Sequence, residues 1–212
     1  LRIMRTRIKV CGFTDPENAA AAAYHGVDAI GLVFYSPSPR NITVEQGQKV
    51  IAALPAFVTT VGLFVDESYA VIERVLSQVP IDLLQFHGDE SPAFCRLAGR
   101  PYIKAVRMRP ETDLMQLADD FFDASALLVD AYHPDLKGGT GHHFDWNLIP
   151  DNYPLPIILA GGIGVENAQQ AIKQARPYAL DVSSGVERQK GMKDIHKIVE
   201  LITEVELGDR RK

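Results

Sequence analysis

Residues 8–34 read IKVCGFTDPENAAAAAYHGVDAIGLVF, and this stretch decides the fold. It opens and closes with short apolar runs, IKVC and AIGLVF, which flank an alanine-rich segment with helical spacing. Continuously apolar runs are typical of parallel strands that are buried on both faces of a sheet. The order strand, helix, strand therefore predicts a βαβ unit in a parallel α/β domain.

The same alternation continues along the whole chain. Strands are expected at residues 8–10, 29–34, 59–64, 83–86, 102–106, 127–129, 157–160 and 179–182, with helices at 15–25, 43–54, 68–79, 91–98, 112–122, 165–174 and 194–205 and a short one at 145–149. Eight units of about 26 residues favour a (β/α)8 (TIM) barrel, which needs about 200 residues, over a doubly wound open sheet of about five or six strands. We expect a single domain over residues 1–212, with residues 1–6 as an N-terminal extension and 207–212 as a C-terminal tail.

Three predicted helices carry recognisable start signals. Thr14 with Glu17 predicts a capping box, with a proline in the first turn, and Thr43 with Gln46 predicts a second one. Residues 91–92 read Ser-Pro, the pattern of an N-cap followed by proline at the first helical position.

The composition excludes several classes of protein. Among 212 residues there are 22 Lys and Arg against 27 Asp and Glu, and 46% are hydrophobic, which is ordinary for a globular domain. The acidic balance argues against binding to nucleic acid, which requires clustered cations. No apolar run approaches the ~20 residues of a membrane span, and no signal peptide is recognisable. Two cysteines fit a reducing, cytoplasmic location.

Polar, reactive and glycine residues gather where the predicted strands end. In a barrel, the carboxyl ends of the strands converge on the face where barrel enzymes keep their chemistry. In strand order, the residues at these ends are Cys11, Ser36 leading to Arg40, Asp66, His87, Arg107, Asp130, Gly161 with Gly162, and Ser183 with Ser184 and Gly185. The opposite strand ends look like ordinary turns, so this asymmetry predicts a site.

Three of these residues have both a catalytic and a structural interpretation. Cys11 lies just before the first helix, whose N-terminus would lower the thiol pKa, although a buried packing role is the alternative. Asp130 is an acid if burial raises the pKa of its carboxyl; otherwise it satisfies loop amides. His87 can pair with Cys11 as a base or be a hydrogen-bonded structural residue.

Glycine-containing turns follow the last three predicted strands. They include Gly139, Thr140 and Gly141, then Gly161 and Gly162, then Ser183, Ser184 and Gly185. Together they are typical of the phosphate site that many barrels build after strands seven and eight. The sequence has no P-loop and no G-x-G-x-x-G after the first strand, and His133, His142 and His143 lack metal-binding spacing, so neither a nucleotide nor a metal is expected.

The motifs closely resemble those of the phosphoribosylanthranilate isomerase family of tryptophan biosynthesis. The matching stretches, in the family's order, are KVCG at residues 9–12, GLVFYSPSPR at 31–40, LQFHGDE at 84–90, GGTGHHFDW at 138–146, LAGGI at 159–163, DVSSGVE at 181–187 and GMKDI at 191–195. They cover nearly the whole chain, and their combination is specific.

The resemblance implies a (β/α)8 barrel that catalyses an Amadori rearrangement. In this reaction N-(5-phosphoribosyl)anthranilate, an aminoaldose, becomes 1-(2-carboxyphenylamino)-1-deoxyribulose 5-phosphate, an aminoketose. By the same resemblance Cys11 is the general base, Asp130 is the general acid and Arg40 engages the anthranilate carboxylate. His87 and the three glycine turns complete the predicted substrate site. The implied ligand is a small phosphosugar, without cofactor, nucleic acid or membrane, in a monomer or homodimer.

Two other functions share part of this pattern. A related phosphosugar isomerase or a lyase of the tryptophan pathway would keep the phosphate-binding turns without needing Cys11, Arg40 and Asp130 together. A non-catalytic barrel that binds a phosphorylated metabolite would keep the turns and lose the acid or the base. Because the acid and the base are both present, the sequence favours the isomerase.

Overall fold

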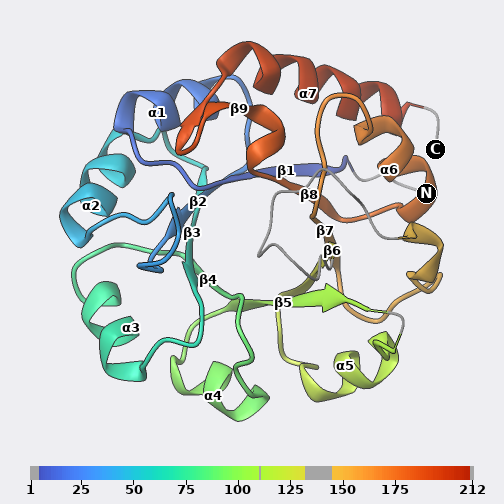
Figure 1. Ribbon diagram of the computed structural model, residues 1–212, viewed down its shortest axis with the longest axis horizontal. Helices are drawn as coiled ribbons and strands as arrows, with labels where there is room; N and C mark the ends of the chain where they lie inside the picture. Colours follow the sequence, from blue (N-terminus) through green and yellow to red (C-terminus); the bar gives the residue numbers. More distant parts are fainter. Residues whose placement is uncertain (1–4, 110, 132–144, 211–212) are drawn as a thin grey trace.

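The computed structural model describes residues 5–109, 111–131 and 145–210, within which eight parallel strands close into a barrel (Figure 1). The strands are β1 (Arg7–Cys11), β2 (Ala29–Val33), β3 (Thr59–Phe64), β4 (Leu83–Phe86), β5 (Tyr102–Met108), β6 (Ala126–Ala131), β7 (Ile157–Leu159) and β8 (Ala179–Val182). Each strand pairs with the next, and β8 pairs with β1, so the sheet is closed. All eight predicted strands are confirmed, and the open doubly wound sheet is excluded.

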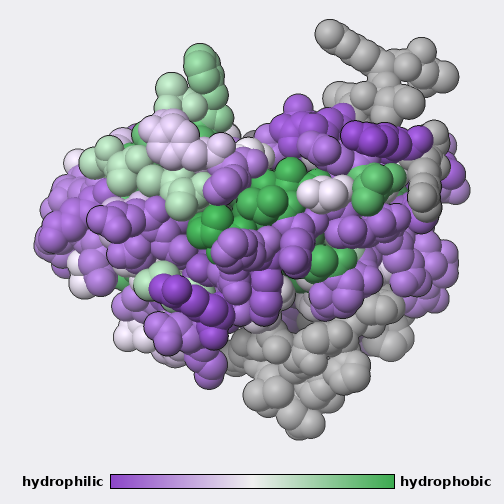
Figure 2. All heavy atoms as spheres, turned by 90° about the horizontal axis from the view of Figure 1, so that it is seen from above, coloured by the Kyte–Doolittle hydropathy of each residue, from purple (hydrophilic) through white to green (hydrophobic). Residues whose placement is uncertain are grey.

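Helices form a ring outside the strands (Figure 1). They are α1 (Pro16–Tyr24), α2 (Val44–Ala53), α3 (Tyr69–Leu76), α4 (Pro92–Leu97), α5 (Leu114–Asp120), α6 (Ala168–Ala175) and α7 (Ile195–Asp209), with 3-10 turns η1 (Trp146–Leu148) and η2 (Ser184–Val186). A small hairpin of β9 (Glu187–Gln189) and β10 (Met192–Lys193), which the sequence did not suggest, precedes α7. Figure 2 shows the side on which α1 and α7 lie, a mainly hydrophilic surface crossed by a short hydrophobic strip.

Two of the predicted helix starts are confirmed in detail. At α2, Thr43 Oγ1 accepts from the Gln46 amide at 3.2 Å, and Gln46 Oε1 accepts from the Thr43 amide at 2.8 Å. This reciprocal pair is a capping box, which satisfies two amides that the helix itself leaves without partners. At α4, Ser91 Oγ accepts from the Phe94 amide at 3.2 Å.

The capping box expected at Thr14 is wrong. Asp15 caps α1 instead, because its carboxylate accepts from the Asn18 amide at 2.8 Å and Pro16 then fills the first helical position. Thr14 Oγ1 donates to the Gly191 carbonyl at 2.8 Å, so this hydroxyl ties the loop after β1 to the loop of the β9–β10 hairpin. Carboxylate and hydroxyl caps are similarly favourable, and the tertiary contact decides between them.

Both ends of the described chain are tied to the barrel. Arg5 pairs with Asp28, and the amide and hydroxyl of Thr6 both donate to Asp209, each at 2.7 Å. Helix α7 runs to Asp209, so residues 207–209, which were expected to belong to the C-terminal tail, are helical.

Strand residues alternate between two buried layers. Leu127 and Val129 belong to the main core between the strands and the helices. Leu128 faces the opposite side, because successive strand side chains alternate, and it packs in a second cluster inside the barrel with Ile103, Ala105, Ala126, Ile158, Ala160 and Ala179. A third, smaller cluster of Cys11, Val33 and Leu63 lies on the inward faces of β1, β2 and β3.

The burial of two leucines predicts that their replacement by alanine changes stability by different amounts. Leu84 on β4 is fully buried, whereas Leu97 at the end of α4 is 61% exposed. Leu84→Ala should lower the free energy of unfolding by about 2–5 kcal/mol, because it removes buried methyl groups and leaves a cavity. Leu97→Ala should change it by less than about 0.5 kcal/mol. Urea unfolding of the two variants measures this, and equal losses would contradict the assigned core.

Candidate active site

The predicted site residues lie at the carboxyl ends of the barrel strands. Cys11 ends β1, Asp130 lies near the end of β6, and His87 follows β4. The turns at Gly161–Gly162 and Ser183–Gly185 follow β7 and β8. Since all eight strands are parallel, these groups share one mouth of the barrel.

The Cys11 side chain lies in space that a glycine on β2 leaves open. Gly31 is its register partner, and a Cβ at that position would lie 2.7 Å from Cys11 Sγ. The Cys11 side chain clusters with Val33 and Leu63, and the residue is 6% exposed. A larger residue at position 31 would therefore displace the sulfur.

The expectation of a lowered thiol pKa is wrong. Burial raises the pKa of the Cys11 thiol, and the nearby Asp181 carboxylate also raises it. Lys9 and Lys193 oppose this effect without outweighing it. The predicted helix effect is weak at Cys11, since α1 begins only at Pro16 and a helix dipole acts within about one turn.

Asp130 faces His87 across the mouth. His87 Nε2 lies 3.4 Å from Asp130 Oδ2, and the two side chains are 21% and 18% exposed. The Gln85 amide lies 2.8 Å from His87 Nδ1, and this contact holds the ring with Nε2 toward the carboxyl group. His87 is thus held beside Asp130, and within the described residues it makes no hydrogen bond to Cys11, unlike the pair considered from the sequence.

Arg40 is held by a carboxylate of the protein itself. Its Nε and Nη2 donate to Oε1 and Oε2 of Glu187 at 2.7 and 2.6 Å, a bidentate pair. Lys193, whose side chain is fully buried, donates to Glu187 Oε1 at 2.8 Å and to the Ser183 carbonyl at 3.2 Å. Burial raises the pKa of the Glu187 carboxyl, but the bonds from Arg40 and Lys193 outweigh it and hold that pKa below its usual value.

The turns after β7 and β8 touch each other through glycine. Gly161 and Gly162 have φ of 80° and 68°, in the left-handed region that glycine readily adopts. A Cβ on Gly185 would lie 2.3 Å from the Ile163 carbonyl oxygen, so only glycine permits this approach. In the described part of the chain, the amides of Gly161, Gly162, Ser184 and Gly185 donate to no acceptor. Free amides on two adjoining turns can bind an anion.

A second buried ion pair stabilises the loops after β3 and β4. Lys104 Nζ donates to Glu90 Oε2 at 3.1 Å and to the Gly88 carbonyl at 2.6 Å. Glu90 Oε1 in turn accepts from the Asp66 amide at 2.9 Å. Lys104 lies on the outward face of β5, since its neighbours Ile103 and Ala105 pack inside the barrel.

Several predicted positions lie outside the described residues. They are Gly139, Thr140 and Gly141 of the first glycine turn and the histidines His133, His142 and His143. Among the residues that the structure does describe, no cluster of three His, Cys, Asp or Glu has metal-binding geometry. Within those same ranges, no helix has the length and apolar character needed to cross a bilayer.

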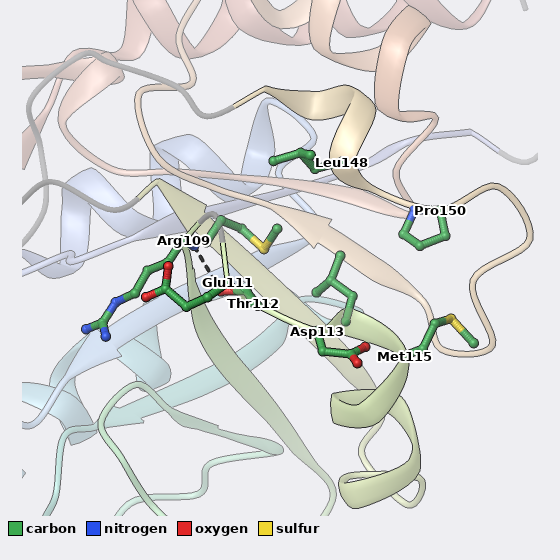
Figure 3. Close-up of a pocket in the computed structure, with 9 residues that line it drawn as sticks. Arg109, Glu111, Thr112, Asp113, Met115, Leu148 and Pro150 are labelled. Atoms are coloured by element: carbon green, nitrogen blue, oxygen red, sulfur yellow. Dashed lines mark hydrogen bonds between the residues drawn. The ribbon is translucent and has the colours of Figure 1, made fainter.

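A separate hollow of about 360 Å³ lies between the end of β5, α5 and the stretch that runs from the end of η1 to Pro150 (Figure 3). Thr112, Met115, Leu148 and Pro150 line it, together with Met108, Arg109, Glu111, Asp113 and Leu114. None of the predicted site residues does so, and we therefore place the candidate site at the barrel mouth.

Comparison with known proteins assigns the family. The family model for N-(5'-phosphoribosyl)anthranilate (PRA) isomerase matches residues 8–204. The chain belongs to the phosphoribosylanthranilate isomerase family. N-(5'-phosphoribosyl)anthranilate isomerases from Azotobacter vinelandii and Thiobacillus denitrificans are 53% and 51% identical to it, over 94% and 95% of this chain and 97% and 98% of theirs.

Solved structures agree with the family assignment. A phosphoribosyl anthranilate isomerase from Thermotoga maritima superposes with a TM-score of 0.87 at 36% identity, over 95% of this chain and 98% of that one. A structure of a phosphoribosyl anthranilate isomerase in complex with reduced 1-(o-carboxyphenylamino)-1-deoxyribulose 5-phosphate superposes with a TM-score of 0.82 at 36% identity, over 95% of this chain and 98% of that one.

Sequence reasoning missed the charged residues that surround Cys11 and Arg40. They are Lys9, Asp181, Glu187 and Lys193. A signal was present for two of them, because Lys9 and Asp181 are single charges within the apolar strands predicted at residues 8–10 and 179–182. Such a residue points into the barrel when its neighbours point outward, and it then needs a partner.

The Glu187 network predicts a pH-dependent contribution to stability. A carboxyl whose pKa is lowered by folding stabilises the protein above its unfolded pKa, and loses that contribution as the pH falls through the folded value. Glu187→Gln should therefore lower the free energy of unfolding at neutral pH, with a difference that shrinks toward about pH 3. Urea unfolding at both pH values tests this, with Glu73→Gln on the exposed face of α3 as control. An equal loss at both pH values would refute it.

Proposed function

We propose that this protein is a phosphoribosylanthranilate isomerase that converts N-(5-phosphoribosyl)anthranilate into 1-(2-carboxyphenylamino)-1-deoxyribulose 5-phosphate. The observation that carries the proposal is the convergence of a thiol, a carboxyl group and a guanidinium on one barrel mouth, at Cys11, Asp130 and Arg40. The names of the relatives support it, since each is described as an isomerase of this substrate.

Asp130 is the general acid in this proposal. Opening of the furanose ring requires a proton on the ring oxygen as the C1′–O bond breaks, and a protonated carboxyl group supplies it. The neighbouring His87 Nε2–H donates toward the carboxylate that remains, which orients it and stabilises the charge left by the proton.

Cys11 is the general base. Ring opening leaves an iminium ion at C1′, which acidifies the C2′ proton, and the Cys11 thiolate takes that proton onto sulfur. The electron pair of the C–H bond forms the enolamine, which becomes the ketone when C1′ is protonated and the C2′ hydroxyl loses its proton. No net proton is gained or lost, and the substrate's own nitrogen is the electron sink, so the proposed reaction needs no cofactor.

Arg40 and the glycine turns hold the two ends of the substrate. The planar guanidinium of Arg40 suits the anthranilate carboxylate, and its Nη1 makes no hydrogen bond within the described residues. The free amides of the turns at Gly161–Gly162 and Ser184–Gly185 suit the 5′-phosphate, with residues 139–141 as the third predicted contribution. The ribose chain then lies between the acid and the base.

The proposal extends to the oligomeric state and the cellular location of the protein. We infer a monomer or a homodimer, since one relative from Thermotoga maritima is described as dimeric. We infer a cytoplasmic enzyme, since both Cys11 and Cys95 are free thiols and the base must stay reduced.

Loss of the fluorescence of phosphoribosylanthranilate on addition of the purified protein tests the activity. The reaction should proceed in the presence of EDTA, with the aminoketose phosphate as the sole product by mass spectrometry and NMR. Absence of turnover by a folded protein would refute the proposal.

Removal of the acid or the base should abolish most of the turnover. Cys11→Ala and Asp130→Asn should each lower kcat by about 10²–10⁴-fold, the usual contribution of a positioned acid or base. Cys95→Ala is the matched control, because Cys95 is a buried thiol on α4. Steady-state kinetics measures the effect. If Cys11→Ala keeps more than about a tenth of the original kcat, Cys11 is a packing residue.

Arg40→Ala should weaken binding more than it slows chemistry. The anthranilate carboxylate is present in the substrate and in the transition state alike, so KM should rise with a smaller change in kcat. Arg96→Ala is the control, since Arg96 makes a similar bidentate pair with Asp123 on the outer surface. Titration with anthranilate-bearing analogues measures the affinity, and an unchanged dissociation constant would place the carboxylate elsewhere.

A further inference from the structure

A buried lysine lies directly beneath the candidate base. Ile8 and Val10 pack outward into the main core, so Lys9 and Cys11 point into the barrel from the same face of β1. Lys9 Nζ donates to Asp181 Oδ1 at 2.8 Å, and the two side chains are 4% and 8% exposed. Lys9 is also the register partner of Asp181 across the β1–β8 seam.

We propose that Lys9 is a positioning residue for the base: its ammonium group, held by Asp181, stabilises the thiolate form of Cys11. This inference rests on the proposed role of Cys11 as the base, and it assigns Lys9 no contact with the substrate.

The groups around Cys11 single out Lys9. Burial is the largest influence on the thiol pKa and raises it, and the positive charge of Lys9 is the strongest influence that lowers it. Lys193 and Arg40 also carry positive charge near Cys11, but both donate to the same Glu187 carboxylate. Lys9 is the cation that lies on the same inward face of β1 as Cys11, two positions away.

Asp181 keeps the lysine charged in a place that disfavours charge. Burial lowers the pKa of Lys9, and the attraction and hydrogen bond of Asp181, together with Cys11, outweigh it, so the net shift is upward. The carboxylate also raises the pKa of Cys11, which is the disadvantage of having it nearby. The effect of the lysine on the thiol pKa is the larger of the two, so the ion pair as a whole favours the thiolate.

A buried ion pair is by itself weak evidence for a role in stability, since well-packed apolar residues of similar size are often as stable. The Lys9–Asp181 pair lies on the inward side of the barrel near Cys11, the proposed base. The Lys104–Glu90 pair, equally buried but on the outward face of β5, offers the comparison.

The pH dependence of alkylation at Cys11 tests the proposal. The background is Cys95→Ala, which leaves Cys11 as the only cysteine. Iodoacetamide modification of the Cys11 peptide, followed by mass spectrometry, gives a midpoint that reports ionisation and a plateau at high pH that reports access. Lys9→Met should move the midpoint upward and slow alkylation at neutral pH by about tenfold or more, with little change in the plateau. Lys104→Met should leave the midpoint unchanged.

A second variant covers the case in which Lys9→Met leaves Asp181 unpaired and the protein unfolded. Lys9→Met with Asp181→Leu removes both charges together, and it should fold and still raise the midpoint. If either variant folds and its alkylation midpoint equals that of the Cys95→Ala protein, the proposal is overturned.

Alkylation needs no substrate, so its outcome is independent of the isomerase assignment. If the midpoint moves but no turnover is found in the original protein, Lys9 tunes the thiol and the proposed function is wrong. If the midpoint moves and the original protein is active, the acidic limb of the pH profile of kcat/KM in Lys9→Met should move to higher pH together with the midpoint.

Discussion

Closure of the sheet between β1 and β8 is the constraint on which the rest of the structure depends. It joins strands from opposite ends of the chain, and the Lys9–Asp181 pair across it spans 172 positions. Once the seam is closed, Cys11 stands beside the turn after β8, and the Ser183 hydroxyl donates to the Cys11 carbonyl at 3.0 Å. The thiol, its cation and the anion-binding turns are thereby fixed relative to one another.

The ion pairs around the mouth hold side chains and loops in place as well as neutralising buried charges. Glu187 receives Arg40 from the loop after β2, Lys193 from β10 and the Gly191 amide at 3.1 Å. One carboxylate thus fixes the guanidinium that is proposed to meet the substrate and holds the β9–β10 hairpin against the barrel. A fixed guanidinium loses less freedom on binding a ligand, which is the advantage of preorganisation.

Local patterns in the sequence predicted what local physics determines. Continuously apolar strands, the Thr43 capping box and the Ser91 cap all formed as expected, because each depends on a few adjacent residues. The rest depended on distant partners. Thr14 lost its cap role to a contact with Gly191, and the Cys11 thiol meets burial and charges from β8 and β10 in place of a helix end. A local pattern can mark a buried charge such as Asp181, but it does not say which distant residue that charge will meet.

A crystal structure with reduced 1-(o-carboxyphenylamino)-1-deoxyribulose 5-phosphate bound would test the central claim most directly. The account predicts the ribulose chain between Cys11 Sγ and the Asp130 carboxyl group. It also predicts the phosphate on the amides of the turns at Gly161–Gly162 and Ser184–Gly185, and the carboxyphenyl group against Arg40. An analogue bound at the opposite end of the strands, or one that touches neither Cys11 nor Asp130, would contradict it.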